Sequence, residues 1–178
     1  MTVRLGSRLG VAAVVAARVG ARELRRNTGE NRATPRGDVE IECGIKRMPG
    51  VNGMRNERSD DLARVSGWTV RTVDYHTAGE PFRIVPDLPF TIAGDSVIER
   101  RSNAQAPGSD GDLLRRLLVN EPRGHADMYG GFIVPPNDDG AHFGVLFWHK
   151  DGFSTACGHG TMALGCWAVR SGLVPPDP

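Results

Sequence analysis

The chain has 178 residues, of which 39% are hydrophobic, and a formal net charge of +1. This composition suffices for one soluble domain, and no apolar run approaches the roughly 18 residues of a membrane-spanning helix, which excludes a membrane protein. The charge is uneven, because residues 1–58 contain twelve Lys/Arg against six Asp/Glu, whereas residues 59–178 contain ten against fifteen. Cys43, Cys157 and Cys166 lack the spacing of a disulfide framework or a zinc site, which suits a reducing cytoplasm.

The N-terminal region is predicted to lie outside the fold. Residues 1–26 carry six arginines, and Arg18 and Arg22 occupy the place of a small-residue cleavage site, which disfavours a secretory signal. A transit peptide and a nucleic-acid-binding arm stay open as alternatives. Residues 27–62 have no apolar periodicity, as in disordered segments. We therefore predict that residues 1–66 form a disordered basic extension, which an upstream extension of the reading frame would explain, with Met48 or Met54 as the true start.

Ordered structure is predicted from Trp68 onward. The patterns at 68–73 and 82–85, on either side of a turn, predict a hairpin. A loop is predicted at 102–111, followed by a helix with one leucine stripe, which Asp112 is placed to cap. Residues 132–134 are a further predicted strand. These elements precede the most informative stretch of the chain.

That stretch contains Cys157. Phe143 to Trp148 is an almost continuous apolar run, typical of a strand covered on both faces, and Asp151 and Gly152 supply a turn after it. Residues 161–169 are apolar nearly all the way round, which predicts an enclosed helix. The cysteine therefore lies between a buried strand and the start of a buried helix.

This position predicts an activated thiol. If the helix begins near Gly158, the backbone N–H groups of its first turn favour anions beside Cys157. The same groups are expected to lower the pKa of the thiol from its reference of about 8.5 towards neutrality. Gly158 and Gly160 leave room for a substrate carboxylate to reach the backbone. The alternative is that Cys157 is a small buried hydrophobic residue, but its placement favours a catalytic role.

Three segments support a family resemblance: Val73–Val85, Glu121–Gly130 and Cys157–Gly165, the last reading Cys-Gly-His-Gly-Thr and ending in Ala-Leu-Gly. In order and spacing they resemble motifs of the proline racemase family, which includes 4-hydroxyproline epimerases and trans-3-hydroxy-L-proline dehydratases. The resemblance runs from about Trp68 to the last residue. Three motifs in register are stronger evidence than any one of them alone.

The resemblance implies an α+β fold of two similar halves, as in proline racemase and diaminopimelate epimerase. Each half is a curved, mostly antiparallel sheet around a central buried helix, and the active site lies between the halves. Residues 67–178 are expected to form a truncated N-terminal half. The second half would carry the other acid/base residue, and without it this chain alone is expected to be inactive.

The resemblance also implies roles for individual residues. Cys157 matches the base that removes the α-proton of proline or a hydroxyproline, and Gly158 and His159 match positions that bind the substrate carboxylate through backbone N–H groups. His76 and His125 belong to family motifs and are expected to line the cleft, although each could equally be a structural hydrogen-bonding residue. No cofactor is implied. The expected partner is a small-molecule substrate, with neither nucleic acid nor membrane, and a homodimer is left open.

Other chemistries fit the residues less well. A pyridoxal enzyme needs a lysine, and the chain has only Lys46 and Lys150. A thiol hydrolase needs a histidine hydrogen-bonded to the cysteine, and His159, two residues away in the same helical turn, is expected to be poorly placed. The histidines show no HxH or HExxH spacing, so no metal site is expected.

Within the family, dehydration of trans-3-hydroxy-L-proline is favoured. The segments Glu121–Gly130 and Gly152–Ser154 look closer to dehydratases, although Ala156 departs from the methionine usually found before the cysteine. Because the deciding residue is expected in the second half, proline racemase and 4-hydroxyproline epimerase stay open as alternatives. So does an inactive fragment or binding remnant.

Overall fold

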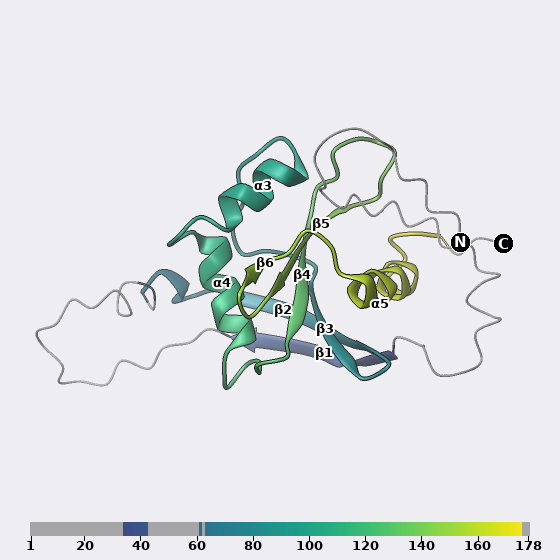
Figure 1. Ribbon diagram of the computed structural model, residues 1–178, viewed down its shortest axis with the longest axis horizontal. Helices are drawn as coiled ribbons and strands as arrows, with labels where there is room; N and C mark the ends of the chain where they lie inside the picture. The colour runs from purple at the N-terminus through teal and green to yellow at the C-terminus, as the bar shows by residue number, and fades with distance from the viewer. Residues whose placement is uncertain (1–33, 43–60, 62, 176–178) are drawn as a thin grey trace, which may run out of the picture.

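The computed structural model describes residues 34–42, 61 and 63–175, and its strands form one six-stranded sheet in chain order (Figure 1). The strands are β1 (Thr34–Glu42), β2 (Thr69–Thr77), β3 (Glu80–Val85), β4 (Tyr129–Val134), β5 (Gly144–His149) and β6 (Gly152–Phe153). Neighbours are antiparallel except β3 and β4, which run parallel. The helices are α3 (Val97–Ala104), α4 (Asp110–Val119) and α5 (Gly158–Arg170). The predicted α+β class with a mostly antiparallel sheet is confirmed.

The sheet is covered on both faces. Figure 1 shows α3 and α4 on one side of it and α5 on the other. Successive residues of β5 pack into the two cores on opposite faces of the sheet. Leu146 and Trp148 belong to the cluster with α3 and α4, whereas Val145 and Phe147 belong to the cluster with α5. This division follows from the two-residue period of a strand. The predicted strand with two buried faces is confirmed.

The predicted hairpin is formed by β2 and β3. Thr77 pairs with Glu80 across a two-residue turn, in which Ala78 and Gly79 have φ angles of 51° and 94°. Two successive positive φ angles are the conformation of a type I′ turn, whose twist matches that of the flanking strands. The turn places Glu80 at the first position of β3.

The helices before β4 differ from the prediction. The predicted loop at 102–111 is wrong at both ends, because residues 102–104 end α3 and residues 110–111 begin α4. The prediction that Asp112 caps α4 is also wrong, because the hydroxyl of Ser109 is the cap and accepts the backbone N–H of Asp112 at 3.0 Å. The Asp112 carboxylate instead accepts from Arg115.

The predicted boundary at residue 67 is too late. Strand β1 pairs with β2 from Thr69 to His76, and Val65, only 2% exposed, packs in the core with α4. Arg64 donates to the carbonyl oxygen of Gly108 at 2.7 Å and pairs with Asp110. The composition of residues 34–42 does not predict this strand. The edge of a sheet offers backbone N–H and C=O groups, which can pair with a strand of almost any side-chain composition. The remaining residues of the extension, with the six arginines and Cys43, lie outside the described residues.

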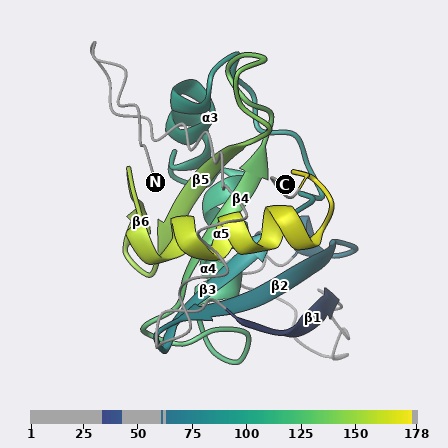
Figure 2. The ribbon, with the colours of Figure 1, turned by 90° about the vertical axis from the view of Figure 1, so that its right-hand side faces the viewer.

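Helix α5 is enclosed on its sheet side only. Leu164 and Ala168 are buried in the core that α5 shares with β2, β3 and β5, but Met162 is 45% exposed and Cys166 is half-buried. Figure 2 shows the helix lying across one face of the sheet. The prediction of a helix buried all the way round is therefore wrong for its outer side.

Gly160 brings the first turn of α5 against β3. A Cβ at this position would lie 2.3 Å from the ring of Phe82, which is fully buried. Gly160→Ala is therefore expected to lower the free energy of unfolding by about 1–3 kcal/mol, the usual cost of overpacking a core. Gly158→Ala is the matched control, because a Cβ at Gly158 meets nothing within 4 Å. Equal midpoints of the two variants in chemical denaturation would contradict this close packing.

Candidate active site

Cys157 is the N-cap residue of α5, with extended backbone angles (φ −151°, ψ 107°). Its carbonyl oxygen accepts the hydroxyl and the backbone N–H of Thr161 at 2.8 and 2.9 Å, which closes the first turn of the helix. The segment before it is tied to the other layer, because Arg101 of α3 donates to the carbonyl oxygens of Phe153 and Ser154. The predicted strand, turn and helix around the thiol are confirmed.

The pKa of Cys157 moves in the opposite direction to the prediction. Burial of the thiol raises its pKa above the ordinary value, the backbone N–H of Gly160 acts against this, and the negative charge of Glu80 raises the pKa further. The helix N-terminus therefore contributes as expected, but desolvation of the half-buried sulfur is the larger effect.

This direction predicts the reactivity of the thiol. In the folded chain, alkylation of Cys157 by iodoacetamide should have a midpoint above the reference pKa of about 8.5, and the denatured chain should return to that reference. The same shift stabilises the folded state at pH values below the pKa that Cys157 has in the unfolded chain. This stabilisation is lost as the pH rises through the pKa of Cys157 in the folded chain. Peptide-resolved mass spectrometry measures the rate at each cysteine. If the alkylation midpoint of the folded chain were at or below that of the denatured chain, the raised pKa of Cys157 would be contradicted.

The imidazole of His159 lies beside the thiol, within hydrogen-bond distance, although its spacing in the sequence predicted a poor position for such a bond to Cys157. The sulfur of Cys157 is 3.5 Å from Nδ1 and 3.7 Å from Nε2 of the imidazole. The ring is held by edge-to-face contacts with Phe82 and Tyr129, at centroid distances of 5.9 and 5.1 Å. The hydroxyl of Thr77 donates to the carbonyl oxygen of His159 at 3.1 Å. Extended backbone at Cys157 folds the thiol back towards the first turn, which sequence spacing alone does not indicate.

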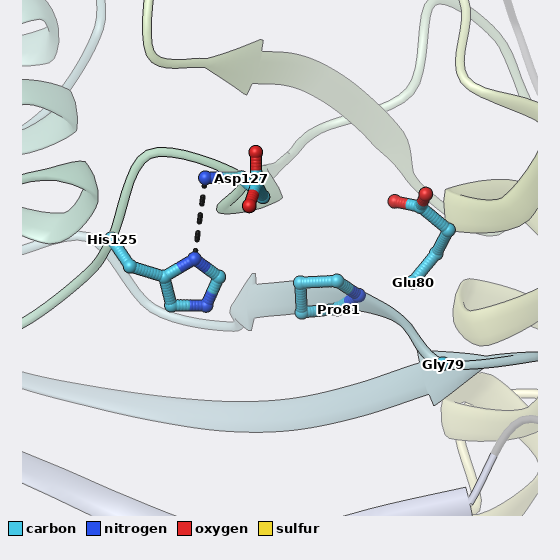
Figure 3. A pocket seen from close by; sticks show the side chains of 5 residues that line it. All are labelled: Gly79, Glu80, Pro81, His125 and Asp127. Atoms are coloured by element: carbon cyan, nitrogen blue, oxygen red, sulfur yellow. Dashed lines mark hydrogen bonds between the residues drawn. The ribbon is translucent and has the colours of Figure 1, made fainter.

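A pocket of about 370 Å³ opens beside the hairpin turn. It is lined by Gly79, Glu80, Pro81, His125 and Asp127, and Figure 3 shows His125 and Asp127 on one side and Glu80 on the other. The backbone N–H of Asp127 donates to Nδ1 of His125 at 3.2 Å, which leaves Nε2 of the ring as the donor. Cys157 does not line the pocket, but the charge of Glu80 acts on the thiol, so the two lie within electrostatic range.

The two histidines from the family motifs differ in position. His125 lines the pocket. His76 lies on β2, where it pairs with Pro81 of β3, and is not among the lining residues. Sequence reasoning did not single out Glu80 or Asp127 as site residues. Both lie inside the family motifs, and Asp127 is two residues from His125. The motif segments therefore already indicated these two residues as candidates for the site.

Arg83 lies on β3, two residues after Pro81 of the pocket lining. It is 6% exposed and forms a bidentate pair with Asp74, with Nε–Oδ1 and Nη2–Oδ2 distances of 2.8 and 2.7 Å. Its Nη1 donates to the carbonyl oxygens of Leu118 and Arg123, at the two ends of the connection from α4 towards His125. A planar guanidinium can satisfy a carboxylate and two carbonyls at once. The buried arginine therefore joins the hairpin to the loop that carries His125.

Within the part of the chain that the structure describes, no group of three His, Cys, Asp or Glu residues is arranged to hold a metal ion. The same residues include no helix that is long and apolar enough to cross a bilayer. The groups near the N-terminus of α5 include the thiol of Cys157, the imidazole of His159 and the carboxylate of Glu80. Side chains of these kinds serve as acids and bases in catalysis.

Known proteins share both the sequence and the fold of this region. A family model described as proline racemase matches residues 72–178. The trans-3-hydroxy-L-proline dehydratase of Burkholderia cenocepacia is 46% identical over 106 residues, and that of Homo sapiens 45%, each over 60% of this chain. The 3-hydroxyproline 2-epimerase of Burkholderia multivorans is 45% identical over the same share. A hydroxyproline epimerase from Agrobacterium vitis, crystallised with trans-4-hydroxy-L-proline, superposes on 59% of this chain with a TM-score of 0.55 at 23% identity.

The matched region is one part of those proteins. The chain spans 31% of the Burkholderia cenocepacia dehydratase, 29% of the human one and 30% of the Agrobacterium vitis structure. At 23% identity, the last comparison supports the fold alone. The family model, however, covers more than half of the chain and includes most of β2, all of β3 to β6, and α5. The chain therefore belongs to the proline racemase family.

Proposed function

We propose that Cys157 is the base in cofactor-independent removal of the α-proton of proline or a hydroxyproline. The observation that carries the proposal is the position of the thiol at the N-cap of α5, with the backbone N–H of Gly160 directed at the sulfur. A thiol in this position exchanges a proton with a substrate whose carboxylate lies at the same helix end. The substrate class comes from the names of the relatives.

The α-hydrogen of an amino acid is a weak acid, so the negative charge that develops on the carboxylate must be stabilised. The first N–H groups of a helix have no acceptor within the helix and favour an anion. We assign this role to the backbone N–H groups of Gly158 and His159, and Gly158 has open space where a side chain would stand. Donors fixed before the reaction stabilise charge without reorganising, which makes them effective in catalysis.

Dehydration of trans-3-hydroxy-L-proline is the favoured reaction. The thiolate of Cys157 takes the α-proton, the bond between the β-carbon and the hydroxyl breaks, and the hydroxyl leaves as water with a proton from an acid group, such as the thiol just formed. The resulting enamine tautomerises to the cyclic imine. Several of the similar proteins bear the dehydratase name. Racemisation or epimerisation is the second candidate, because an equally similar relative is a 3-hydroxyproline 2-epimerase. The reactions share the first proton transfer and differ in the later steps.

The test combines this chain with the part of the Burkholderia cenocepacia dehydratase that it does not match. Proline, trans-3-hydroxy-L-proline and trans-4-hydroxy-L-proline are incubated with the pair in D2O and followed by NMR. Dehydration should convert only the 3-hydroxy compound and give the imine. Racemisation or epimerisation should instead give the inverted isomer with deuterium at the α-carbon. If none of the three substrates lost its α-proton, the proposed function would be contradicted and a binding remnant supported.

A further inference from the structure

The segment between β6 and α5 passes from one core of the molecule to the other. Figure 2 shows β6 at the edge of the sheet. Phe153, the last residue of β6, is buried in the core that contains residues of α3 and α4. Cys157 packs against the other core, which contains residues of α5, and the two residues before it, Thr155 and Ala156, are exposed. The position of the thiol therefore depends on how the chain leaves β6.

The guanidinium of Arg101 holds the chain at this point. Its Nε donates to the carbonyl oxygen of Ser154 at 3.2 Å, and its Nη2 donates to that of Phe153 at 2.6 Å. Because the guanidinium is planar and its donors point in fixed directions, it orients these two adjacent carbonyl groups together. At the other end of the segment, Thr161 donates to the carbonyl oxygen of Cys157. Hydrogen bonds thus fix both ends of the segment.

Helix α3 gives Arg101 a firm base. The helix begins with the capping box of Ser96 and Glu99, and the backbone N–H of Val97 donates to Oδ1 of Asn137 at 2.7 Å. Val97 is also buried in the core. The backbone of Arg101, one turn further along the helix, is therefore held independently of the segment that its side chain contacts.

Helix α4 holds the other end of β6 in the same way. The buried Arg115 donates through Nη1 to the carbonyl oxygens of His149 and Lys150, at 3.0 and 2.7 Å. These two residues precede β6, whereas the carbonyl groups bound by Arg101 belong to its last residue and the residue after it. Arginines from two helices therefore fix the chain before β6 and at its end.

We propose that Arg101 is a positioning residue for Cys157, which holds the thiol at the N-terminus of α5 from the opposite face of the sheet. The catalytic consequence of this role rests on the proposed function of Cys157. The pKa of the thiol responds to burial, to the backbone N–H of Gly160 and to Glu80. Arg101 is not among these causes, so it acts through the backbone between Phe153 and Cys157 and not through its charge.

The experiment measures iodoacetamide alkylation in the full chain by peptide-resolved mass spectrometry, with Cys166 of the same helix as the internal reference. Arg101→Gln is expected to raise the rate of Cys157 about fivefold or more, because the released segment exposes the thiol and lowers its pKa towards the ordinary value. The rate of Cys166 should not change. Arg101→Lys keeps the charge but has a single nitrogen for two carbonyl groups, so its effect should be smaller. Arg100→Gln is the matched control, because Arg100 is the neighbour on α3 and donates to the carbonyl oxygen of Pro135, outside the segment.

Two labelling results would overturn the inference. One is an unchanged rate of Cys157 in Arg101→Gln. The other is an equal acceleration of Cys157 and Cys166, which would indicate a general loss of stability and not a displaced thiol.

Turnover by the chain paired with the remainder of the dehydratase is the second measurement. Arg101→Gln should lower kcat about tenfold or more, since a misplaced base no longer meets the α-proton in line, whereas Arg100→Gln should keep the wild-type value. An unchanged kcat in Arg101→Gln would also overturn the inference. If the wild-type pair removes no α-proton from any substrate, the proposed function fails, and the labelling rates alone decide whether Arg101 positions the thiol.

Discussion

Replacing Cys157 by serine is expected to abolish turnover of trans-3-hydroxy-L-proline by the chain paired with the remainder of a dehydratase. A serine hydroxyl keeps nearly the same volume and leaves the N-cap of α5 in place. It does not ionise near neutral pH, however, so the substitution removes the proposed base while the fold is kept. Since a positioned acid/base group contributes about 10²–10⁴-fold, we expect a loss of at least that size in kcat.

Cys166→Ser is the matched control for this substitution. Cys166 lies on the same helix and is half-buried like Cys157, but it stands more than two turns away from the N-terminus. Its replacement should leave kcat within about twofold, since substitutions outside a site usually have small effects. NMR detection of the imine product measures both variants. Turnover by Cys157→Ser at the wild-type rate would remove Cys157 from the mechanism.

The parts of the fold that the sequence predicts share one property, which is that a local pattern determines them. The hairpin of β2 and β3 follows from two alternating runs around a turn with glycine. The buried strand β5 and the helix after Cys157 follow from long apolar runs with a turn between them. In each case the residues that specify the element lie within it, so no knowledge of distant contacts is needed.

Helix α3 is absent from the sequence prediction although its signal is local. Ser96 and Glu99 form a reciprocal capping box, in which each side chain accepts the other residue's backbone N–H. This serine-x-x-glutamate spacing is visible in the sequence. Only two side chains of the helix, Val97 and Ala104, are buried, so there is no apolar stripe to reveal it. Strand β1 has no such signal, since its place depends on the free edge of β2.

Sequence patterns predict only part of the candidate site. Motifs identify Cys157 and the glycines around it, and they contain Glu80 and Asp127. They do not give the direction of the pKa shift, because desolvation of the sulfur depends on the groups that pack over it in three dimensions. Nor do they give the contact with His159, which depends on the backbone angles of Cys157 and on the rings of Phe82 and Tyr129.

The 178-residue chain assayed by itself is expected to turn over neither proline nor trans-3-hydroxy-L-proline at an enzymatic rate. Among the described residues, the groups across the pocket from Glu80 are His125 and Asp127, and all three are exposed. Water therefore reaches this pocket. Donors in contact with solvent stabilise developing charge far less than donors in a closed site.

A second loss comes from the other face of the α-carbon. Cys157 and His159 lie at the N-terminal end of α5, and the described residues that line the pocket include no thiol or hydroxyl. A missing acid/base group removes about 10²–10⁴-fold, in addition to the effect of water. Adding the unmatched part of the dehydratase should supply both the cover and this group, with the product yield depending on its concentration. If the chain alone formed product, and Cys157→Ser abolished this activity, the chain would contain a complete active site.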